Sequence, residues 1–175
     1  LGCKSQQGLD TIGITATKLH ATLLLNIFKA QAPQKTYPEL IQNPLQPVSL
    51  ADSYQGNFQY FFSGGYLPGN STDAVSAMLA KTYKAQLVIN LSNVDYLYDK
   101  DPKANSNAKP ILACSYQELL AITGSSWSAG KHMPFDPIGT TVLQQSAIPL
   151  LLCSAQLSNL DAVLCNQQFV GTLVR

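Results

Sequence analysis

The segment richest in chemically useful side chains follows a short apolar run at residues 86–91. Its three carboxylates and two phenols are Asp95, Asp99, Asp101, Tyr96 and Tyr98. An apolar run rich in β-formers and followed by polar residues predicts a parallel strand that ends in a binding loop, at the sheet edge where ligands bind in open α/β folds. Aromatic faces beside carboxylates that can accept hydrogen bonds from hydroxyl groups favour a nucleoside over a bare anion. A purely structural loop is the alternative, because Asp101-Pro102 is also a common turn start.

A second loop follows the β-type run at residues 58–62. Gly64 and Gly65 permit close approach of the backbone, and Ser71 and Thr72 supply hydroxyl groups at the predicted start of a helix. Free N–H groups and hydroxyls at a helix N-terminus can bind an anion or a polar base. The same residues also fit an ordinary N-cap.

A third candidate loop, residues 130–136, leads into a helix that Asp136 caps and that has Pro137 at its first position. Lys131 and His132 lie within reach of a phosphate in this loop, although a solvated turn explains them equally well. If the strands are parallel, all three loops meet at one edge of the sheet.

The elements that must position these loops alternate along the chain. The patterns predict helices at 11–29, 72–83, 115–120, 136–146 and 159–166, and strands at 58–62, 86–91, 149–153 and 169–174. Asp10 or Thr11 is available as the first N-cap, and Ser115 with Glu118 forms a capping box. This alternation predicts an α/β fold in which a mainly parallel sheet carries helices on both faces. Without a repeat or a linker, we expect a single domain over residues 1–175.

Composition excludes several classes of function. Apolar residues make up 46% of the 175 residues and charged residues only 12%, which predicts a globular chain with surface buried in a homo-oligomer. The net charge of +1, without a basic run, disfavours nucleic acid as a partner. No apolar run approaches the length of a membrane span, so we expect no membrane contact. Four widely spaced cysteines without metal-ligand spacing indicate a reducing, cytoplasmic location.

Five motifs in one order give the chain a specific likeness. These are D-T-I-G-I-T-A-T-K-L-H-A-T-L-L at 10–24, G-G-Y-L-P-G-N-S-T-D-A-V-S-A-M-L-A at 64–80, N-V-D-Y-L-Y-D-K-D-P at 93–102, A-G at 129–130 with D-P at 136–137, and V-G-T-L at 170–173. Together they resemble the uridylate (UMP) kinases of the amino-acid kinase superfamily, especially the archaeal type. The likeness covers nearly the whole chain, and implies an amino-acid kinase-like domain of which this is the C-terminal portion.

The resemblance implies transfer of the ATP γ-phosphoryl group to UMP, with Mg²⁺ accompanying ATP, in an oligomer built from paired subunits. It implies that Asp10 binds the acceptor ribose and that Asp136 orients catalytic lysines around the transferred group. The remaining residues that it implicates are Gly64, Gly65, Ser71 and Thr72 around UMP, and Ser92, Asn93, Tyr98, Asp101 and Pro102 around the ATP nucleoside.

The chain also departs from the family pattern. The family's N-terminal strand, with its catalytic lysine and Gly-Gly phosphate loop, has no counterpart in these 175 residues, and Lys18 replaces an arginine. Tyr96 stands where the family has glycine, and residues 130–133 replace a run of small residues. A non-catalytic homologue that binds a nucleotide or oxyanion, or acts as an oligomeric scaffold, is therefore the alternative. Another acceptor of the superfamily, such as carbamate, an amino acid or isopentenyl phosphate, fits Asp10 and Ser71 less well.

Overall fold

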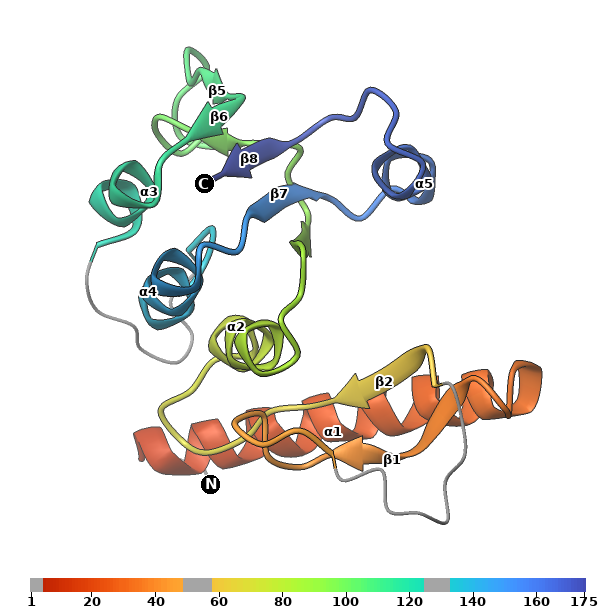
Figure 1. The fold of residues 1–175 in the computed structure, drawn as a ribbon. Helices are drawn as coiled ribbons and strands as arrows, with labels where there is room; N and C mark the ends of the chain where they lie inside the picture. Colours follow the sequence, from red (N-terminus) through yellow and green to blue (C-terminus); the bar gives the residue numbers. More distant parts are fainter. Residues whose placement is uncertain (1–4, 49–57, 125–132) are drawn as a thin grey trace.

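The computed structural model describes residues 5–48, 58–124 and 133–175. Its helices are α1 (Gln6–Gln31), α2 (Thr72–Thr82), α3 (Tyr116–Thr123), α4 (Pro137–Ser146) and α5 (Leu157–Leu164). Its strands are β1 (Thr36–Ile41), β2 (Tyr60–Ser63), β3 (Val88–Ser92), β4 (Leu97–Tyr98), β5 (Pro110–Ile111), β6 (Ala113–Cys114), β7 (Leu150–Ser154) and β8 (Thr172–Val174). The predicted α/β class is confirmed (Figure 1).

The described strands form three separate sheets. The largest has the order β3-β7-β8-β6, in which β3 with β7 and β6 with β8 are parallel, whereas β7 and β8 are antiparallel. Strands β1 and β2 form a parallel pair, and β4 and β5 form an antiparallel pair. Most pairings are therefore parallel, as predicted, but the sheet is divided.

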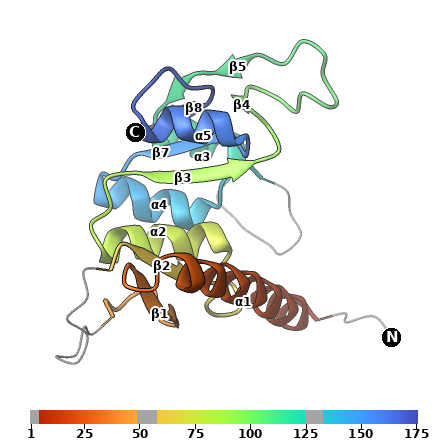
Figure 2. The ribbon, with the colours of Figure 1, turned by 90° about the vertical axis from the view of Figure 1, so that its right-hand side faces the viewer.

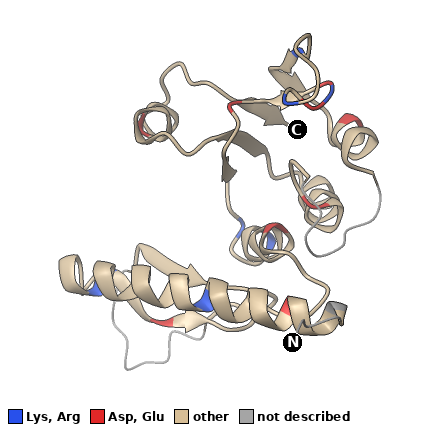
Figure 3. Cartoon of the chain, turned by 180° about the vertical axis from the view of Figure 1, so that it is seen from behind, with Lys and Arg blue, Asp and Glu red and all other residues tan. Residues whose placement is uncertain are grey.

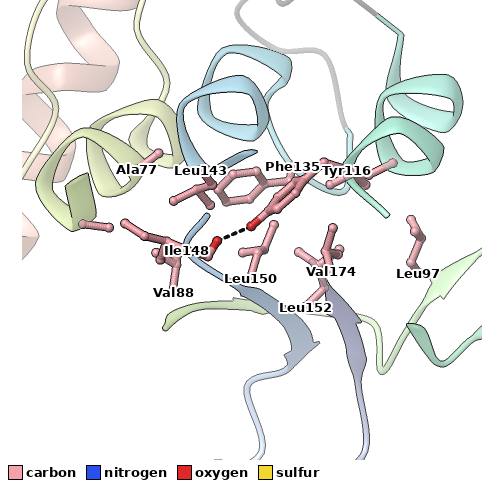
Figure 4. Packing of buried hydrophobic residues seen from close by; sticks show 12 residues of the cluster. Ala77, Val88, Leu97, Tyr116, Phe135, Leu143, Ile148, Leu150, Leu152 and Val174 are labelled. Carbon is pink, nitrogen blue, oxygen red and sulfur yellow. Dashed lines mark hydrogen bonds between the residues drawn. The ribbon is translucent and has the colours of Figure 1, made fainter. Parts of the chain in front are cut away.

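The core of the molecule lies between the four-stranded sheet and the helices α2, α3 and α4. Figure 4 shows its side chains, with Phe135 and Leu143 packed over the strand residues Leu150 and Leu152. The phenol of Tyr116 donates a hydrogen bond to the carbonyl of Ile148, so the buried polar atom has a partner.

Helices cover both faces of this sheet. Figure 1 shows α2, α3 and α4 on one side and α5 on the other. Helix α1 instead packs along the β1–β2 pair, below α2 and α4 in Figure 2. None of the helices in the described part of the chain has both the length and the apolarity that crossing a bilayer requires.

The first helix begins earlier than predicted. The hydroxyl of Ser5 accepts a hydrogen bond from the Gly8 N–H at 3.1 Å, which makes Ser5 the N-cap of α1. The interpretation of Asp10 or Thr11 as the cap is therefore wrong, because both residues lie inside the helix. By contrast, the predicted capping box of Ser115 and Glu118 and the predicted cap at Asp136 are both present.

Candidate functional site

The glycine loop at residues 64–71 lies directly on α1. A Cβ atom on Gly64 would lie 2.9 Å from the backbone N and Cα of Lys18, so the two backbones are too close for any side chain. The Gly65 N–H donates to the hydroxyl of Thr17 at 2.8 Å. The glycines therefore permit close approach of the backbone, as predicted. The segment that they approach is α1.

Asp10 holds the far end of the same loop. Its carboxylate is 9% exposed and accepts a hydrogen bond from the Gly69 N–H at 2.7 Å. Gly69 has a φ of 87°, a conformation that glycine adopts without strain. Asp10 thus lies beside the predicted acceptor loop, as its proposed role requires, and it also fixes the shape of that loop.

The end of the glycine loop meets the N-terminus of α4. The hydroxyl of Ser71 caps α2 by accepting from the Ala74 N–H at 3.1 Å, and it donates to Asp136 Oδ2 at 2.5 Å. Asp136 is completely buried, and its Oδ1 accepts from the Ile138 N–H at 2.6 Å. Two helix N-termini, each favourable for negative charge, therefore face one another at this contact.

A third carboxylate in this cluster was not among the predicted site residues. Asp73 Oδ2 accepts a hydrogen bond from the backbone N–H of Asp136 at 3.1 Å, and Asp73 Oδ1 accepts from the side-chain amide of Asn90 at 3.2 Å. Burial raises the pKa of Asp73 to about 6, and the charge of Asp136 acts in the same direction against the opposing effect of the Asp136 N–H. Asp73 is therefore protonated more readily than an ordinary aspartate.

The predicted donor-side residues lie on a different part of the molecule. Ser92 ends β3, and its hydroxyl exchanges hydrogen bonds of 3.1 Å with the backbone of Val94. Asn93, Asp101 and Pro102 are exposed in the loop and hairpin that follow. The side chains of Ser92 and Asp101 form hydrogen bonds within their own segment, and no hydrogen bond of the described residues joins either of them to the Ser71–Asp136 contact.

Tyr96 and Tyr98 form an aromatic pair in the donor-side segment. Their ring centroids lie 6.4 Å apart at an interplanar angle of 88°, an edge-to-face arrangement. Tyr96 is not among the described residues with positive φ, so the backbone there does not need the glycine of the family pattern. The ring of Tyr96 packs against Tyr98, which is also half-buried.

The structure therefore assembles only part of the predicted site. Five of the predicted residues are linked by the contacts described above, namely Asp10, Gly64, Gly65, Ser71 and Asp136. Thr72 is instead exposed, in the first turn of α2. Lys131 and His132 fall outside the described residues.

Three partners in the site were missed, namely Thr17, Asp73 and Asn90. Asp73 follows Ser71 and Thr72 in the same motif, so its carboxylate at a helix N-terminus was a usable signal. Asn90 interrupts the apolar run 86–91, and a polar side chain in a strand that packs on the core requires a hydrogen-bond partner.

Comparison with known sequences places this arrangement among phosphotransferases. Residues 6–154 match the profile described as the amino acid kinase family. The chain is 31% identical over 167 residues to the uridylate kinase of Thermoplasma acidophilum, covering 95% of this chain and 69% of that protein. It is 34% identical over 167 residues to the uridylate kinase of Methanoculleus marisnigri, covering 94% and 68%.

Solved structures agree with the sequence comparison. The uridylate kinase of Archaeoglobus fulgidus superposes with a TM-score of 0.76 at 28% identity, over 98% of this chain and 73% of that one. The UMP kinase of Bacillus anthracis superposes with a TM-score of 0.70 at 15% identity, over 98% and 70%, and so supports the fold alone.

Proposed function

The chain belongs to the amino acid kinase family, and from this membership we propose that it is a uridylate kinase, which transfers the γ-phosphoryl group of ATP to UMP to give UDP. The chain spans about 70% of the length of the curated relatives described above. The predicted acceptor loop and the predicted donor-side hairpin both lie within this chain, so both can be tested on it.

The hydrogen bond between Ser71 and Asp136 is the observation that carries the proposal. It joins the end of the glycine loop, where the acceptor is expected, to the carboxylate expected beside the transferred phosphoryl group. Phosphoryl transfer depends mainly on positioning and on charge stabilisation, and two facing helix N-termini with a fixed carboxylate supply both. Asp10 adds a carboxylate at the other end of the same loop.

Mg²⁺ would enter this site with ATP. Within residues 5–48, 58–124 and 133–175, no group of three or more His, Cys, Asp or Glu side chains is placed to hold a metal ion. Mg²⁺ commonly binds through one or two carboxylates together with the phosphates of the substrate. In that mode the triphosphate would supply most of the ligands, and the metal would neutralise its charge.

We further propose a homo-oligomer in which α1 pairs with α1 of a second copy. One stripe of α1 is apolar and 42–68% exposed, and consists of Leu9, Ile12, Leu19, Leu23 and Ile27. Their spacing of three, four or seven positions is that of packed helix pairs. The stripe leaves several hundred Å² of apolar surface in water, a large share of the roughly 800 Å² that each partner buries in a standard interface.

The charged residues of α1 do not interrupt this stripe. The Lys18 ammonium donates to Gln42 and the Lys29 ammonium to the Pro38 carbonyl, while Asp10 bonds the glycine loop. Figure 3 shows how little charge the helix carries. A surface without charge fits an identical surface better than a charged partner, and a two-fold axis across α1 would bury it completely.

Sedimentation and thermal melting test the oligomer. We expect Leu19→Lys with Leu23→Lys to convert the protein to monomers with an intact fold, and Thr22→Lys, outside the stripe, to leave the assembly unchanged. A monomeric wild type would contradict this part of the proposal.

The described cysteines are compatible with the cytoplasmic location that we propose. Cys114, Cys153 and Cys165 are free thiols, as expected for a protein of a reducing compartment.

Two measurements test the kinase proposal itself. We expect UMP to raise the melting temperature of the purified protein, and Mg²⁺-ATP with UMP to yield UDP in a coupled assay. The absence of both effects would reject the proposal. Stabilisation by UMP without UDP formation would instead support a homologue that binds nucleotide without catalysing its phosphorylation.

A further inference from the structure

We propose that Asp73 and Asn90 are positioning residues, which together clamp the N-terminus of α4 so that Asp136 faces the acceptor loop. This inference deepens the proposed function and rests on it, since it concerns how the acceptor side of the site is held. Neither residue needs to contact a substrate in this role.

The clamp is formed by three elements that are distant in sequence. The two oxygens of Asp73, on α2, accept one hydrogen bond from the backbone of Asp136, at the start of α4, and one from the side chain of Asn90, on β3. A hydrogen bond in the opposite direction also joins the two helices, because the carboxylate of Asp136 accepts from the hydroxyl of Ser71, the N-cap of α2. Because each of the two helices contributes an acceptor to the other, neither N-terminus can shift without breaking a hydrogen bond.

Close packing leaves these groups little freedom. A Cβ atom on Gly139, in the first turn of α4, would lie 3.1 Å from the carbonyl oxygen of Asp73 and 2.9 Å from the ring of Phe135. The backbones of α2 and α4 therefore touch beside the clamp. Such contact makes a displacement of Asp73 a displacement of Asp136 as well.

Asn90 gives the clamp its second function. It lies two residues before Ser92, which is the first residue implicated on the donor side, and both belong to β3. The amide of Asn90 therefore joins the strand that leads to the donor side to the carboxylate that holds the acceptor side. The charges around Asp73 explain why an amide is needed at position 90. Asp73 already faces the carboxylate of Asp136, and Asn90 supplies a hydrogen-bond donor that adds no further negative charge.

An exchange of the two side chains tests the clamp. Asn90→Asp places two carboxylates together and removes the amide donor, and measurement at pH 8 favours ionisation of both over a proton shared between them. Adding Asp73→Asn to this variant restores an amide–carboxylate pair in the reverse orientation, and the side-chain carbonyl introduced on α2 can still accept from the Asp136 N–H. Asn90→Ala removes the donor without adding charge, and it serves if Asn90→Asp does not fold.

Two readouts are measured on each variant, namely the dissociation constant of UMP and the hydrogen exchange of the Asp136 and Ile138 amides in ligand-free protein. We expect Asn90→Asp to raise the UMP dissociation constant at least tenfold and to accelerate exchange at least tenfold. The double variant should return both values to within threefold of the wild type. Gln145→Glu, which adds the same charge at an exposed position of α4, and Ser76→Ala, on the outer face of α2, should change neither.

Unchanged exchange in folded Asn90→Asp or Asn90→Ala, or a double variant no better than Asn90→Asp, would overturn the clamp. Altered exchange with unaltered UMP affinity would also overturn it, because the contact would then be structural only. If the wild type does not bind UMP, the proposed function fails and the role in positioning the acceptor fails with it. A wild type that binds UMP while the variants bind it equally well would reject the clamp alone.

Discussion

The acceptor side and the donor side of the site differ in how far they are built before any ligand arrives. On the acceptor side, buried carboxylates at Asp10 and Asp136 hold a glycine loop and two helix N-termini by hydrogen bonds between distant segments. On the donor side, the exposed carboxylate of Asp101 bonds the N–H of Lys103, two residues further on in the same turn. The acceptor side is preorganised by tertiary contacts, whereas the donor side is a local hairpin.

This difference predicts different costs for changes on the two sides. A residue that is already fixed in the fold loses little entropy when a ligand binds, but its removal weakens the fold itself. A residue on an exposed hairpin contributes little to folding, so its removal affects the ligand alone. The variants below test this contrast, beginning with the largest expected effect.

Substitution of Asp136 should cause the largest loss. Asp136→Ala removes the N-cap of α4 and leaves the Ser71 hydroxyl without its acceptor, which together should cost roughly 2–4 kcal/mol of unfolding free energy. We also expect UDP formation to fall about a hundredfold, equivalent to about 2.7 kcal/mol of transition-state stabilisation. Urea denaturation and the coupled assay measure the two effects.

Ser115→Ala is the matched control, because it removes the capping box of α3 away from the site. It should cost about 1 kcal/mol of stability without weakening UMP binding. Equal losses of activity in the two variants would mean that Asp136 acts through general stability.

A side chain at Gly64 should separate the glycine loop from α1. In Gly64→Ala the new Cβ would collide with the backbone of Lys18, and we expect a loss of about 1–3 kcal/mol of stability together with weaker UMP binding. The matched control is Gly13→Ala in α1, where a new Cβ would meet open space. It should instead stabilise the protein by about 0.5–1 kcal/mol. Chemical denaturation of both variants and UMP titration provide the comparison. A neutral Gly64→Ala would show that the loop does not need its close contact with α1.

Asp73 should make the stability of the acceptor side depend on pH. Its pKa is raised from 3.8 to about 6 in the folded protein, so the folded state binds this proton more tightly than the unfolded state. Stability from this group is therefore present below pH 4 and is lost as the pH rises through 6, to an extent of about 2–3 kcal/mol. Asp136 is the charged group that faces Asp73, and Ser71 and Asn90 are neutral.

Asp73→Asn isolates this effect, since the amide can still accept from the Asp136 N–H while Asn90 turns its own carbonyl toward it. We expect the variant to match the wild type near pH 4 and to exceed its stability at pH 7. Denaturation curves of both proteins between pH 4 and pH 8 give the difference. Parallel curves would show that the burial of Asp73 does not penalise its charge.

Most of the elements were predictable because their signals are local. The Ser115 capping box and the Asp136-Pro137 start of α4 each depend on a few adjacent residues, and both are confirmed. The strand at 149–153 has the same local character and is also confirmed, as β7. The α/β class follows from the alternation of such signals.

The cross-links of the site could not be predicted in the same way. Asp10 lies within a helix pattern, and nothing near it in sequence indicates that its partner is the Gly69 N–H. The convergence of three loops was predicted from one parallel sheet, but β2 and β3 belong to different sheets. The Ser71–Asp136 contact confirms the meeting of two of the three predicted loops. Among the described residues, the strand that leads into the third loop is linked to this contact through Asn90 and Asp73. Tertiary packing decides which polar groups meet.

The donor side should show the smallest effect on stability and the most selective effect on a ligand. Asp101→Ala removes one exposed turn hydrogen bond to the Lys103 N–H, so we expect a loss of no more than about 0.5–1 kcal/mol of stability. If Asp101 contacts the ATP nucleoside, the dissociation constant of ATP should rise several-fold while that of UMP stays unchanged. Isothermal titration with each nucleotide separates the two.

Asp99→Ala is a close control for this variant. Asp99 is also an exposed carboxylate in the same hairpin, where it accepts a hydrogen bond from the Lys109 N–H at 2.8 Å, but it is not among the residues implicated in ATP binding. We expect the two variants to lose similar stability and only Asp101→Ala to lose ATP affinity. Equal ATP affinities would mean that the hairpin carboxylates serve the turn alone. The contrast between an acceptor side held by tertiary contacts and a donor side held by local hydrogen bonds would then hold for folding but not for nucleotide binding.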